Sequence, residues 1–210
     1  MSAVTTIFCD IGGVLLTDGW GHAARRQAVA EFGLDEQEFG QRHEYVSRAI
    51  ETDEMSLEQY LDRVVFYEPR PFSREQFKAF MFGQSQPYEE HIALIGQIAE
   101  SGRYQMATLN NEILELNLYR ISQFDLAQHF SVFLSSCFLR MRKPDEEIYE
   151  AALRITHRQP QECLFIDDRE ANLESPRMMG MQTILFRQLD QLREELRKHG
   201  VDAVHQGFIG

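Results

Sequence analysis

Several polar side chains in this sequence closely follow short apolar or β-branched segments. The first is Asp10, which comes directly after the apolar residues 4–9. The others, in chain order, are Asn110, Asn111, Lys143, Asp167, Asp168 and Asn172. If the apolar segments are parallel strands, their carboxyl ends meet at one edge of the sheet, where ligands bind. We therefore expect carboxylates, amides and a lysine to gather at that edge.

Three aspartates gathered in this way would repel one another. Two like charges about 4 Å apart cost on the order of 4 kcal/mol at an effective dielectric of 20, so such a group raises its own pKa values or recruits a cation. An all-oxygen site suits Mg²⁺, which binds through one or two carboxylates and substrate phosphate. A carboxylate beside Mg²⁺ can attack phosphorus and form an aspartyl-phosphate, with the lysine and amides stabilising the phosphoryl oxygens.

Each of these residues also has a simpler structural explanation. An aspartate that ends a strand often forms a turn or caps a helix, and an Asp-Asp pair before a helix can do the same. Asn111 and Asp145 are plausible N-caps of the helices that follow them. The joint pattern favours a site, because four successive strand ends each supply one element of phosphoryl transfer.

Hydrophobic patterning indicates how these residues are positioned. Strands are expected at residues 4–9, 104–109, 131–135, 163–166 and 182–186, and helices at 88–100, 112–123, 146–155 and 189–198. Strands that alternate with helices of this length predict an α/β fold, a Rossmann-like parallel sheet with helices on both faces. Gly102 is the expected C′ glycine of the helix that precedes it.

Residues 15–86 interrupt this alternation with helical patterns and no strand. Phe39, His43, Val46 and Ile50 have the spacing of one helix face. Ser56 with Gln59, and Ser73 with Gln76, fit the capping-box pattern at two further helix starts. We therefore predict an α/β core formed by residues 1–14 and 87–210 and an all-helical insertion at 15–86. Its hinges are expected near residues 17–21 and 83–87.

Composition excludes several classes of protein. The chain has 210 residues, of which 43% are hydrophobic and 26% charged, so it can bury a full core. A net charge of −12 argues against a nucleic-acid partner. No apolar run reaches the roughly 18 residues that span a bilayer, so no membrane association is expected. Three cysteines and the lack of a visible signal peptide predict a cytoplasmic protein. A monomer is compatible with the sequence, which carries no signal for oligomeric state.

Four segments in this order resemble the motifs of the haloacid dehalogenase-like (HAD) hydrolase superfamily. They are FCDIGGVL at residues 8–15, ATLNN at 107–111, RKPDEEIY at 142–149 and FIDDREAN at 165–172, with Gly180 downstream. The third and fourth motifs are specific and the second is loose. The insertion after the first strand is similar to the helical cap of subfamily I, so the resemblance covers essentially the whole chain.

The resemblance implies a role for each matching residue. Asp10 would be the nucleophile, and Mg²⁺ would be held by Asp10, the Gly12 carbonyl and the carboxylates of Asp167 and Asp168. Gly12 and Gly13 would form the phosphate-binding turn after the nucleophile. Phosphate would also be bound by Asn110 and the backbone of Asn111. Lys143 would stabilise charge on the nucleophile and the phosphate, and Asn172 would support the site from behind.

Two positions depart from the family pattern. Family phosphatases usually carry an aspartate two residues after the nucleophile as general acid and base, and here that residue is Gly12. Because general acid–base catalysis contributes roughly 10²- to 10⁴-fold, we predict a slow phosphatase or one that prefers good leaving groups. Asp18 and His22 are the nearest candidate donors in sequence, although a structural or exposed position is expected for both. Asn110 replaces the usual Ser or Thr.

The helical insertion offers further candidates near the site. Trp20, His22 and Arg25 could reach a substrate from the entrance to the insertion. The interpretation we favour makes Trp20 a packing residue at the hinge and places Arg25 on a solvated face. The aromatic residues of the insertion are expected to form its core.

The leading hypothesis is a Mg²⁺-dependent phosphatase of a small phosphorylated metabolite. One alternative is a 2-haloacid dehalogenase-type hydrolase in which Asp10 attacks carbon without a metal, which would leave the Asp167–Asp168 pair without a purpose. Another is a catalytically impaired phosphate-binding or regulatory protein, suggested by Gly12 and Asn110. A phospho-accepting receiver domain is excluded, because its acidic pair precedes the acceptor aspartate whereas here the pair comes last.

Overall fold

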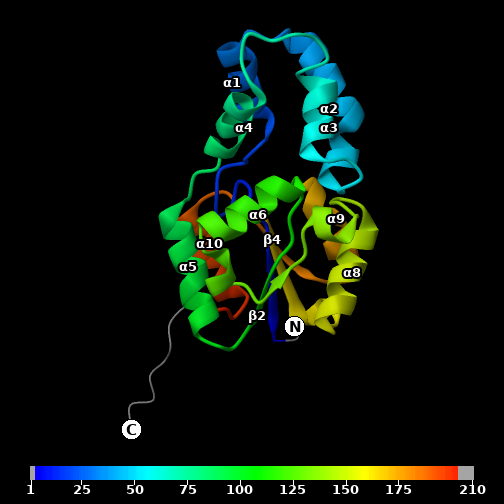
Figure 1. Ribbon diagram of the computed structural model, residues 1–210. Coiled ribbons are helices and arrows are strands. Elements are labelled where there is room, and N and C mark those ends of the chain that lie inside the picture. The colour runs from blue at the N-terminus through cyan, green and yellow to red at the C-terminus, as the bar shows by residue number, and fades with distance from the viewer. Residues whose placement is uncertain (1–2, 203–210) are drawn as a thin grey trace.

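The computed structural model describes residues 3–202, and its centre is a parallel sheet of five strands (Figure 1). The strands are β1 (Thr6–Cys9), β2 (Gln105–Thr108), β3 (Val132–Phe133), β4 (Cys163–Asp167) and β5 (Gln182–Leu185). Their order in the sheet is β3-β2-β1-β4-β5, so β1 lies at the centre with β2 and β4 as its neighbours. The predicted α/β fold with a parallel sheet is confirmed.

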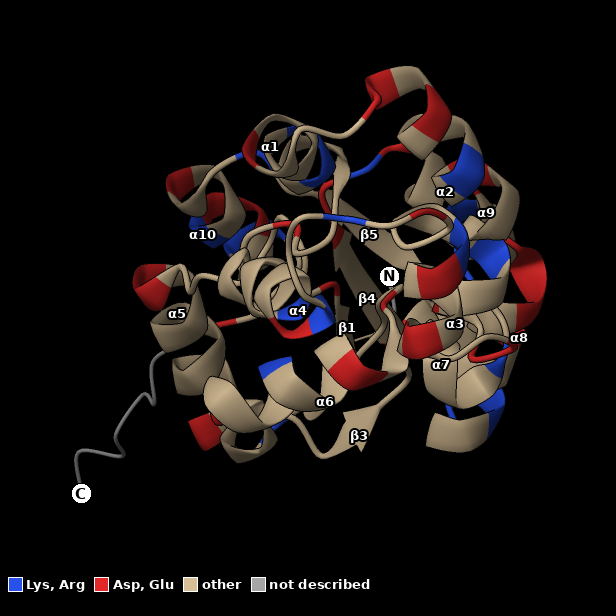
Figure 2. Ribbon diagram, turned by 45° about the horizontal axis from the view of Figure 1, so that its top comes forward, with Lys and Arg blue, Asp and Glu red and all other residues tan. Residues whose placement is uncertain are grey.

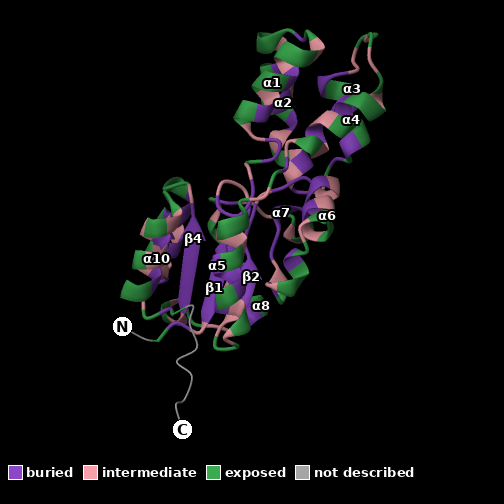
Figure 3. Ribbon diagram, turned by 90° about the vertical axis from the view of Figure 1, so that its left-hand side faces the viewer, coloured by how far each residue is buried: buried purple, intermediate pink, exposed green. Residues whose placement is uncertain are grey.

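Helices cover both faces of this sheet. They are α5 (Glu89–Glu100), α6 (Leu114–Gln123), α7 (Ser136–Leu139), α8 (Glu146–Thr156), α9 (Ala171–Met179) and α10 (Leu189–Lys198), with short 3₁₀ helices η1 (Leu126–Gln128) and η2 (Pro160–Glu162). Side chains of β1 alternate between the faces, since Ile7 and Cys9 pack with α5 and α10 whereas Phe8 packs with α8 and α9. Figure 3 shows the buried strands between these layers.

Four helices form the helical insertion between β1 and α5, at one end of the core (Figure 1). They are α1 (His22–Phe32), α2 (Glu36–Glu51), α3 (Leu57–Val64) and α4 (Arg74–Gly83). Both predicted capping boxes are present, at the starts of α3 and α4. The buried face of α2 consists of the four residues that the periodicity picked out, from Phe39 to Ile50. The domain boundaries at residues 14–15 and 86–87 stay a prediction, and residues 1–2 and 203–210 of the predicted core lie outside the described residues.

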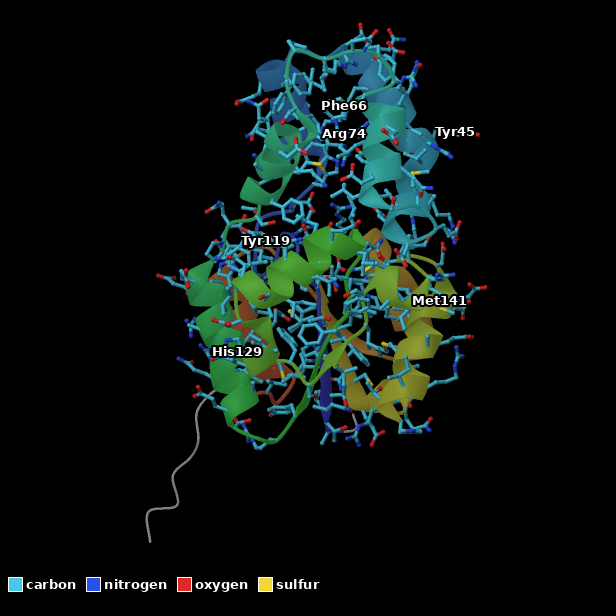
Figure 4. All side chains as sticks on the ribbon, in the orientation of Figure 1. Tyr45, Phe66, Arg74, Tyr119, His129 and Met141 are labelled. Atoms are coloured by element: carbon cyan, nitrogen blue, oxygen red, sulfur yellow. The ribbon has the colours of Figure 1, made fainter. Side chains whose placement is uncertain are left out.

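The insertion has its own apolar core, which continues onto the α/β core. Aromatic rings occupy much of it, including Phe66, over which the Arg74 guanidinium lies 4.6 Å from the ring centroid (Figure 4). Ile113 and Leu116, at the start of α6, belong to the same buried cluster. Further along α6, Tyr119 packs edge-on against Phe82 of α4. The insertion is therefore joined to the core by an apolar seam over α6.

The two chain segments that connect the insertion to the core lie side by side. The Thr17 amide donates to the Gln86 carbonyl at 2.9 Å, and the Thr17 hydroxyl accepts from the Gln86 amide at 2.9 Å. The Tyr88 amide donates to the Leu15 carbonyl at 2.9 Å. The predicted hinge segments are thus adjacent and hydrogen-bonded to each other.

Several local predictions differ from the structure. The strand expected at residues 131–135 is only two residues long. The helix expected at residue 112 begins at Leu114 with Ile113 as its N-cap, so the proposed N-cap role of Asn111 is wrong. Asp145 is the N-cap residue of α8 but makes no capping hydrogen bond, because its carboxylate pairs with Arg48 of α2. Both side chains have long-range partners that local patterns do not encode.

Acidic and basic residues are interspersed on the helices of both the insertion and the core (Figure 2). Within residues 3–202, no helix has the length and apolar character needed to cross a membrane.

Candidate active site

The carboxyl ends of β1 and β4 bring together the three predicted aspartates. β1 and β4 are paired in register up to Cys9 and Ile166, and the Asp10 amide donates to the Ile166 carbonyl at 2.9 Å. Asp10 and Asp167 therefore leave neighbouring strands at the same height. One carboxylate oxygen from each of Asp10, Asp167 and Asp168 lies within 4.8 Å of the others.

Lys143 reaches this cluster from the loop before α8. Its Nζ lies 3.1 Å from Asp10 Oδ1 and 2.6 Å from Asp167 Oδ2. The lysine and Asp167 are buried, and Asp10 is 8% exposed. Lys143 therefore contacts two of the three carboxylates, which leaves the cluster with excess negative charge.

The surroundings perturb the ionisation of these groups. The pKa of Asp10 is raised to about 7: burial is the largest cause, Lys143 opposes it, and the charges of Asp167 and Asp168 add to the rise. Burial, followed by the charge of Asp167, also raises the pKa of Asp168. Burial alone would lower the pKa of Lys143, but the charges of Asp10 and Asp167 outweigh burial and raise it. The lysine therefore stays protonated while the carboxylates compete for positive charge.

Asp167 is held by hydrogen bonds from its own loop. The Asn172 amide donates to both of its carboxylate oxygens, at 3.0 and 3.1 Å, and the Arg169 backbone amide donates at 2.8 Å. The Asn172 carbonyl accepts in turn from the Tyr149 hydroxyl at 2.7 Å. The structure therefore places Asn172 behind Asp167, where it fixes the orientation of that carboxylate.

The donor set fits a hard divalent cation. Asp168 Oδ1 is buried and has no hydrogen-bond partner among the described residues, although a buried polar atom normally has one. Gly13 has a φ of 74°, and a Cβ there would overlap the Asp168 carboxylate, so glycine leaves room for that group. Oxygen ligands of this kind are those that Mg²⁺ takes. Asp10, Asp167 and Asp168 are the residues that could hold it, and Gly12 lines a cavity together with Asp10.

The two asparagines after β2 have separate positions. Asn110 is buried: its amide donates to Asn117 at 3.1 Å and its carbonyl oxygen accepts from the Ser135 hydroxyl at 2.8 Å. Asn111 is hydrogen-bonded in both directions to the backbone of Lys143, each at 2.9 Å. The Asn111 side chain therefore fixes the loop that carries the lysine. Of the two asparagines, Asn111 lines the cavity next to Asp10, and Asn110 does not.

A cavity of about 280 Å³ lies above the aspartates, between the core and the helical insertion. Asp10 and Lys143 line one part of it, and Trp20, Arg25 and His43 of the insertion line another. Its lining is rich in charged side chains, and the size suits a small polar molecule.

The four candidates from the insertion have distinct positions. Trp20 is buried and donates from Nε1 to the Tyr60 hydroxyl at 2.8 Å, so it packs as expected. His22 is exposed and does not line the cavity. Asp18 pairs with Arg169 at 3.0 Å, and a Cβ at residue 12 would lie 3.3 Å from its carboxylate. The solvated position expected for Arg25 is wrong, because α1 turns this side chain toward the cavity and Nη1 donates to the Trp20 carbonyl at 2.5 Å.

Sequence reasoning missed several residues that support the site. They are the cavity-lining pairs Arg142–Glu51 and Arg120–Glu112, together with Asn117, Ser135 and Arg169. Glu112 and Arg120 are buried, and Arg120 also donates to the Thr17 carbonyl beside the hinge. Their positions eight residues apart on the same segment carry no recognisable motif, so the pairing follows only from the fold.

Comparisons with known proteins agree with this geometry. Residues 4–180 match the haloacid dehalogenase-like hydrolase family. The chain is 26% identical over 145 residues to flavin mononucleotide hydrolase 1 of Arabidopsis thaliana, an alignment that covers 69% of this chain and 58% of that protein. It is 40% identical over 74 residues to bifunctional epoxide hydrolase 2 of Rattus norvegicus, covering 35% of this chain and only 13% of that protein.

Solved structures share the fold. An HAD family enzyme from Bacteroides thetaiotaomicron superposes with a TM-score of 0.78 at 18% identity, covering 89% of this chain and 95% of that one. The same enzyme in complex with magnesium and inorganic phosphate has a TM-score of 0.75, covering 88% of this chain and 95% of that one.

Proposed function

The chain belongs to the haloacid dehalogenase-like hydrolase family, and from this premise we propose that it is a Mg²⁺-dependent phosphatase of a small phosphorylated metabolite. The observation that carries the proposal is the cluster of Asp10, Asp167 and Asp168 with one buried lysine and an unpartnered carboxylate oxygen. The names of two relatives support it, since one is a flavin mononucleotide hydrolase and one neighbour binds magnesium with inorganic phosphate.

In this proposal the Asp10 carboxylate attacks the phosphorus of a phosphate monoester. The new bond joins an Asp10 oxygen to phosphorus, the bond from phosphorus to the ester oxygen breaks, and the leaving alkoxide takes up a proton from water to become the alcohol. Water then attacks the phosphorus of the aspartyl-phosphate and releases inorganic phosphate and the Asp10 carboxylate. When bound by Asp167 and Asp168 with Asp10, Mg²⁺ would neutralise charge on the phosphoryl oxygens.

Lys143 has two tasks in this scheme. Its ammonium contacts Asp10 directly, so it favours the ionised nucleophile that burial alone would disfavour. It also supplies positive charge where the phosphoryl oxygens gather in the transition state. Asn111 holds the backbone of that lysine, and Asn172 holds Asp167, so both act by positioning other groups.

Protonation of the leaving group is expected to be the weak step of this reaction. Gly12 offers no side chain for this step, and the nearest carboxylate to its Cβ position, that of Asp18, is engaged by Arg169. A phosphate ester whose leaving group needs no proton, such as an aryl phosphate, should therefore react faster than an alkyl ester. The loss expected for a missing general acid is about 10²- to 10⁴-fold.

The test is phosphate release measured with and without Mg²⁺ across a panel of phosphorylated metabolites. Asp10→Asn and chelation by EDTA should each abolish release, whereas Asp190→Asn, at an exposed aspartate of α10, is the matched control and should retain it. Hydrolysis that persists in Asp10→Asn or in EDTA would contradict the assigned roles.

A catalytically impaired phosphate-binding protein is the second candidate. It is favoured by the absence of a side chain at Gly12 and by the internal hydrogen bonds of Asn110, whose amide is already engaged by Asn117. Binding of a phosphate mimic together with Mg²⁺, without turnover of any ester, would support it. Metal-independent chloride release from chloroacetate would instead favour the dehalogenase alternative.

A further inference from the structure

Arg25 differs from the other basic residues around the cavity. It lies in the first turns of α1, is only partly exposed, and lines the cavity from the side of the helical insertion. Its Nη1 donates to the Trp20 carbonyl at 2.5 Å, which ties the side chain to a buried tryptophan. Within residues 3–202, no Asp or Glu carboxylate oxygen lies within 4.0 Å of an Arg25 guanidinium nitrogen, the distance that defines an ion pair.

Every other arginine or lysine that lines the cavity has a carboxylate partner. The pairs are Lys143 with Asp10 at 3.1 Å, Arg142 with Glu51 at 3.0 Å, Arg169 with Asp18 at 3.0 Å, and Arg120 with Glu112. Asp18 and Glu51, two of the carboxylates whose charges act on Arg25, are therefore already engaged by other arginines. Among the described residues that line the cavity, Arg25 is thus the lysine or arginine without a carboxylate at ion-pair distance.

Such an arginine has unused binding capacity. A guanidinium carries five N–H donors in a planar fork that matches carboxylate and phosphate, and Arg25 uses one nitrogen, Nη1, to donate to the Trp20 carbonyl. Burial lowers the pKa of Arg25, which reflects the cost of withdrawing its charge from water. An anionic ligand in the cavity would offset that cost.

We propose that Arg25 binds a second anionic group of the substrate, a carboxylate or a further phosphate, remote from the phosphoryl group that Asp10 attacks. The inference rests on the proposed phosphatase function and narrows its substrate class to small phosphate monoesters with a second negative charge. Asp10 and Arg25 line the same cavity from the core and from the insertion, so one small molecule can contact both. Trp20 fixes Arg25 in place and makes the site specific for position as well as charge.

The experiment compares phosphate monoesters that differ only at the far end. Propyl and pentyl phosphates are matched with analogues of the same length ending in a carboxylate or in a second phosphate. Charge-assisted hydrogen bonds to an arginine predict about 10- to 100-fold higher kcat/KM for the preferred anionic terminus than for the methyl terminus. The two anionic series identify whether carboxylate or phosphate is the better ligand.

Variants at two adjacent arginines give the controls. Arg25→Leu should reduce the ratio between anionic and methyl termini to near one, and Arg25→Lys should retain part of it. Arg26→Leu, at the exposed neighbour in α1, should keep the wild-type ratio. A wild-type enzyme without preference at either chain length, or an Arg25→Leu loss that is equal for all esters, would overturn the proposal. Thermal melting establishes that the Arg25 variants are folded.

Calorimetry tests anion binding by Arg25 independently of phosphatase activity. Titration of the same esters into Asp10→Asn, and into Asp10→Asn combined with Arg25→Leu, measures the preference without turnover. If no ester is hydrolysed, including p-nitrophenyl phosphate with Mg²⁺, the proposed function fails. Tighter binding of the anionic esters that disappears without Arg25 would still support the second anion site, and equal binding of all esters would reject it.

Discussion

His43 provides the sharpest prediction for the helical insertion, because its ring is buried beside two other polar groups. Trp20 Nε1 can only donate, so the Tyr60 hydroxyl accepts from it at 2.8 Å. Among the described residues the remaining partner of this buried hydroxyl is His43 Nδ1, at 2.9 Å, so the Tyr60 proton is donated to it. This chain requires an unprotonated Nδ1 and therefore a neutral imidazole. Burial, aided by the charge of Arg25, lowers the pKa of His43 to about 3.

The size of the resulting change in the free energy of unfolding follows from proton linkage. The unfolded chain takes up a proton at His43 near the ordinary pKa of 6.5, whereas the folded protein does so only near 3. Below 6.5 the unfolded state therefore binds more protons, and the free energy of unfolding falls as the pH falls, by 1.36 kcal/mol per unit. Between about pH 7.5 and about pH 5, His43 alone should cost the wild type about 2 kcal/mol.

Urea denaturation at the two pH values measures this cost as a difference between variants. His43→Asn retains a polar atom near the position of Nδ1 but cannot titrate, so it should lose about 2 kcal/mol less than the wild type on acidification. His22→Asn, at an exposed histidine of α1, controls for the loss of a histidine. If His43→Asn and the wild type lose the same stability, the histidine is not held neutral and the reasoning is refuted.

Further predictions concern the aspartate cluster. Mg²⁺ should raise the melting temperature of the wild type, and Asp168→Asn should reduce that increase, because its unpartnered oxygen is a candidate ligand. Lys143→Met should destabilise the metal-free protein by about 3–5 kcal/mol in urea titrations, since Asp10 and Asp167 lose their buried partner, and Mg²⁺ should restore part of the loss. Gly13→Ala should weaken Mg²⁺ binding measured by calorimetry, because residue 13 has a φ of 74° and a Cβ there would overlap the Asp168 carboxylate. Unchanged affinity would show that the space left by Gly13 is not needed for metal binding.

Local patterns predicted the parts of the fold that depend on neighbouring residues. The capping boxes at Ser56 and Ser73 and the buried face of α2 follow from spacings of three and four residues, and the structure reproduces them. The proximity of Asp10 to Asp167 could also be predicted from the sequence, because the carboxyl ends of parallel strands lie at one edge of the sheet regardless of the connecting segments.

The side-chain roles that could not be predicted from the sequence depend on partners far away along the chain. Asn111 looked like a helix cap, but two hydrogen bonds to Lys143, 32 residues away, use its side chain instead. Arg25 looked like a solvated residue, since nothing in its local sequence indicates that α1 turns it toward the cavity. In each case the role depends on a segment distant in the sequence, and a single chain carries no local signal for such pairings.

The contacts between the helical insertion and the core fall into two kinds with different energies. Over α6 the contact is apolar and buried, through Ile113 and Leu116. At the end of α2 it is polar: the Ser136 hydroxyl of α7 donates to the Glu51 carbonyl at 2.7 Å, and three ion pairs join this end to the segment that carries Lys143, namely Arg48–Asp145 at 2.8 Å, Glu51–Arg142 at 3.0 Å and Asp53–Arg140 at 3.9 Å. Solvent-accessible pairs contribute about 1 kcal/mol or less each, whereas apolar burial contributes about 25 cal/mol per Å². The ion pairs on the α2 side are individually weak, and a rotation of the insertion about its adjacent linkers that separated them would open the cavity there, beside Lys143.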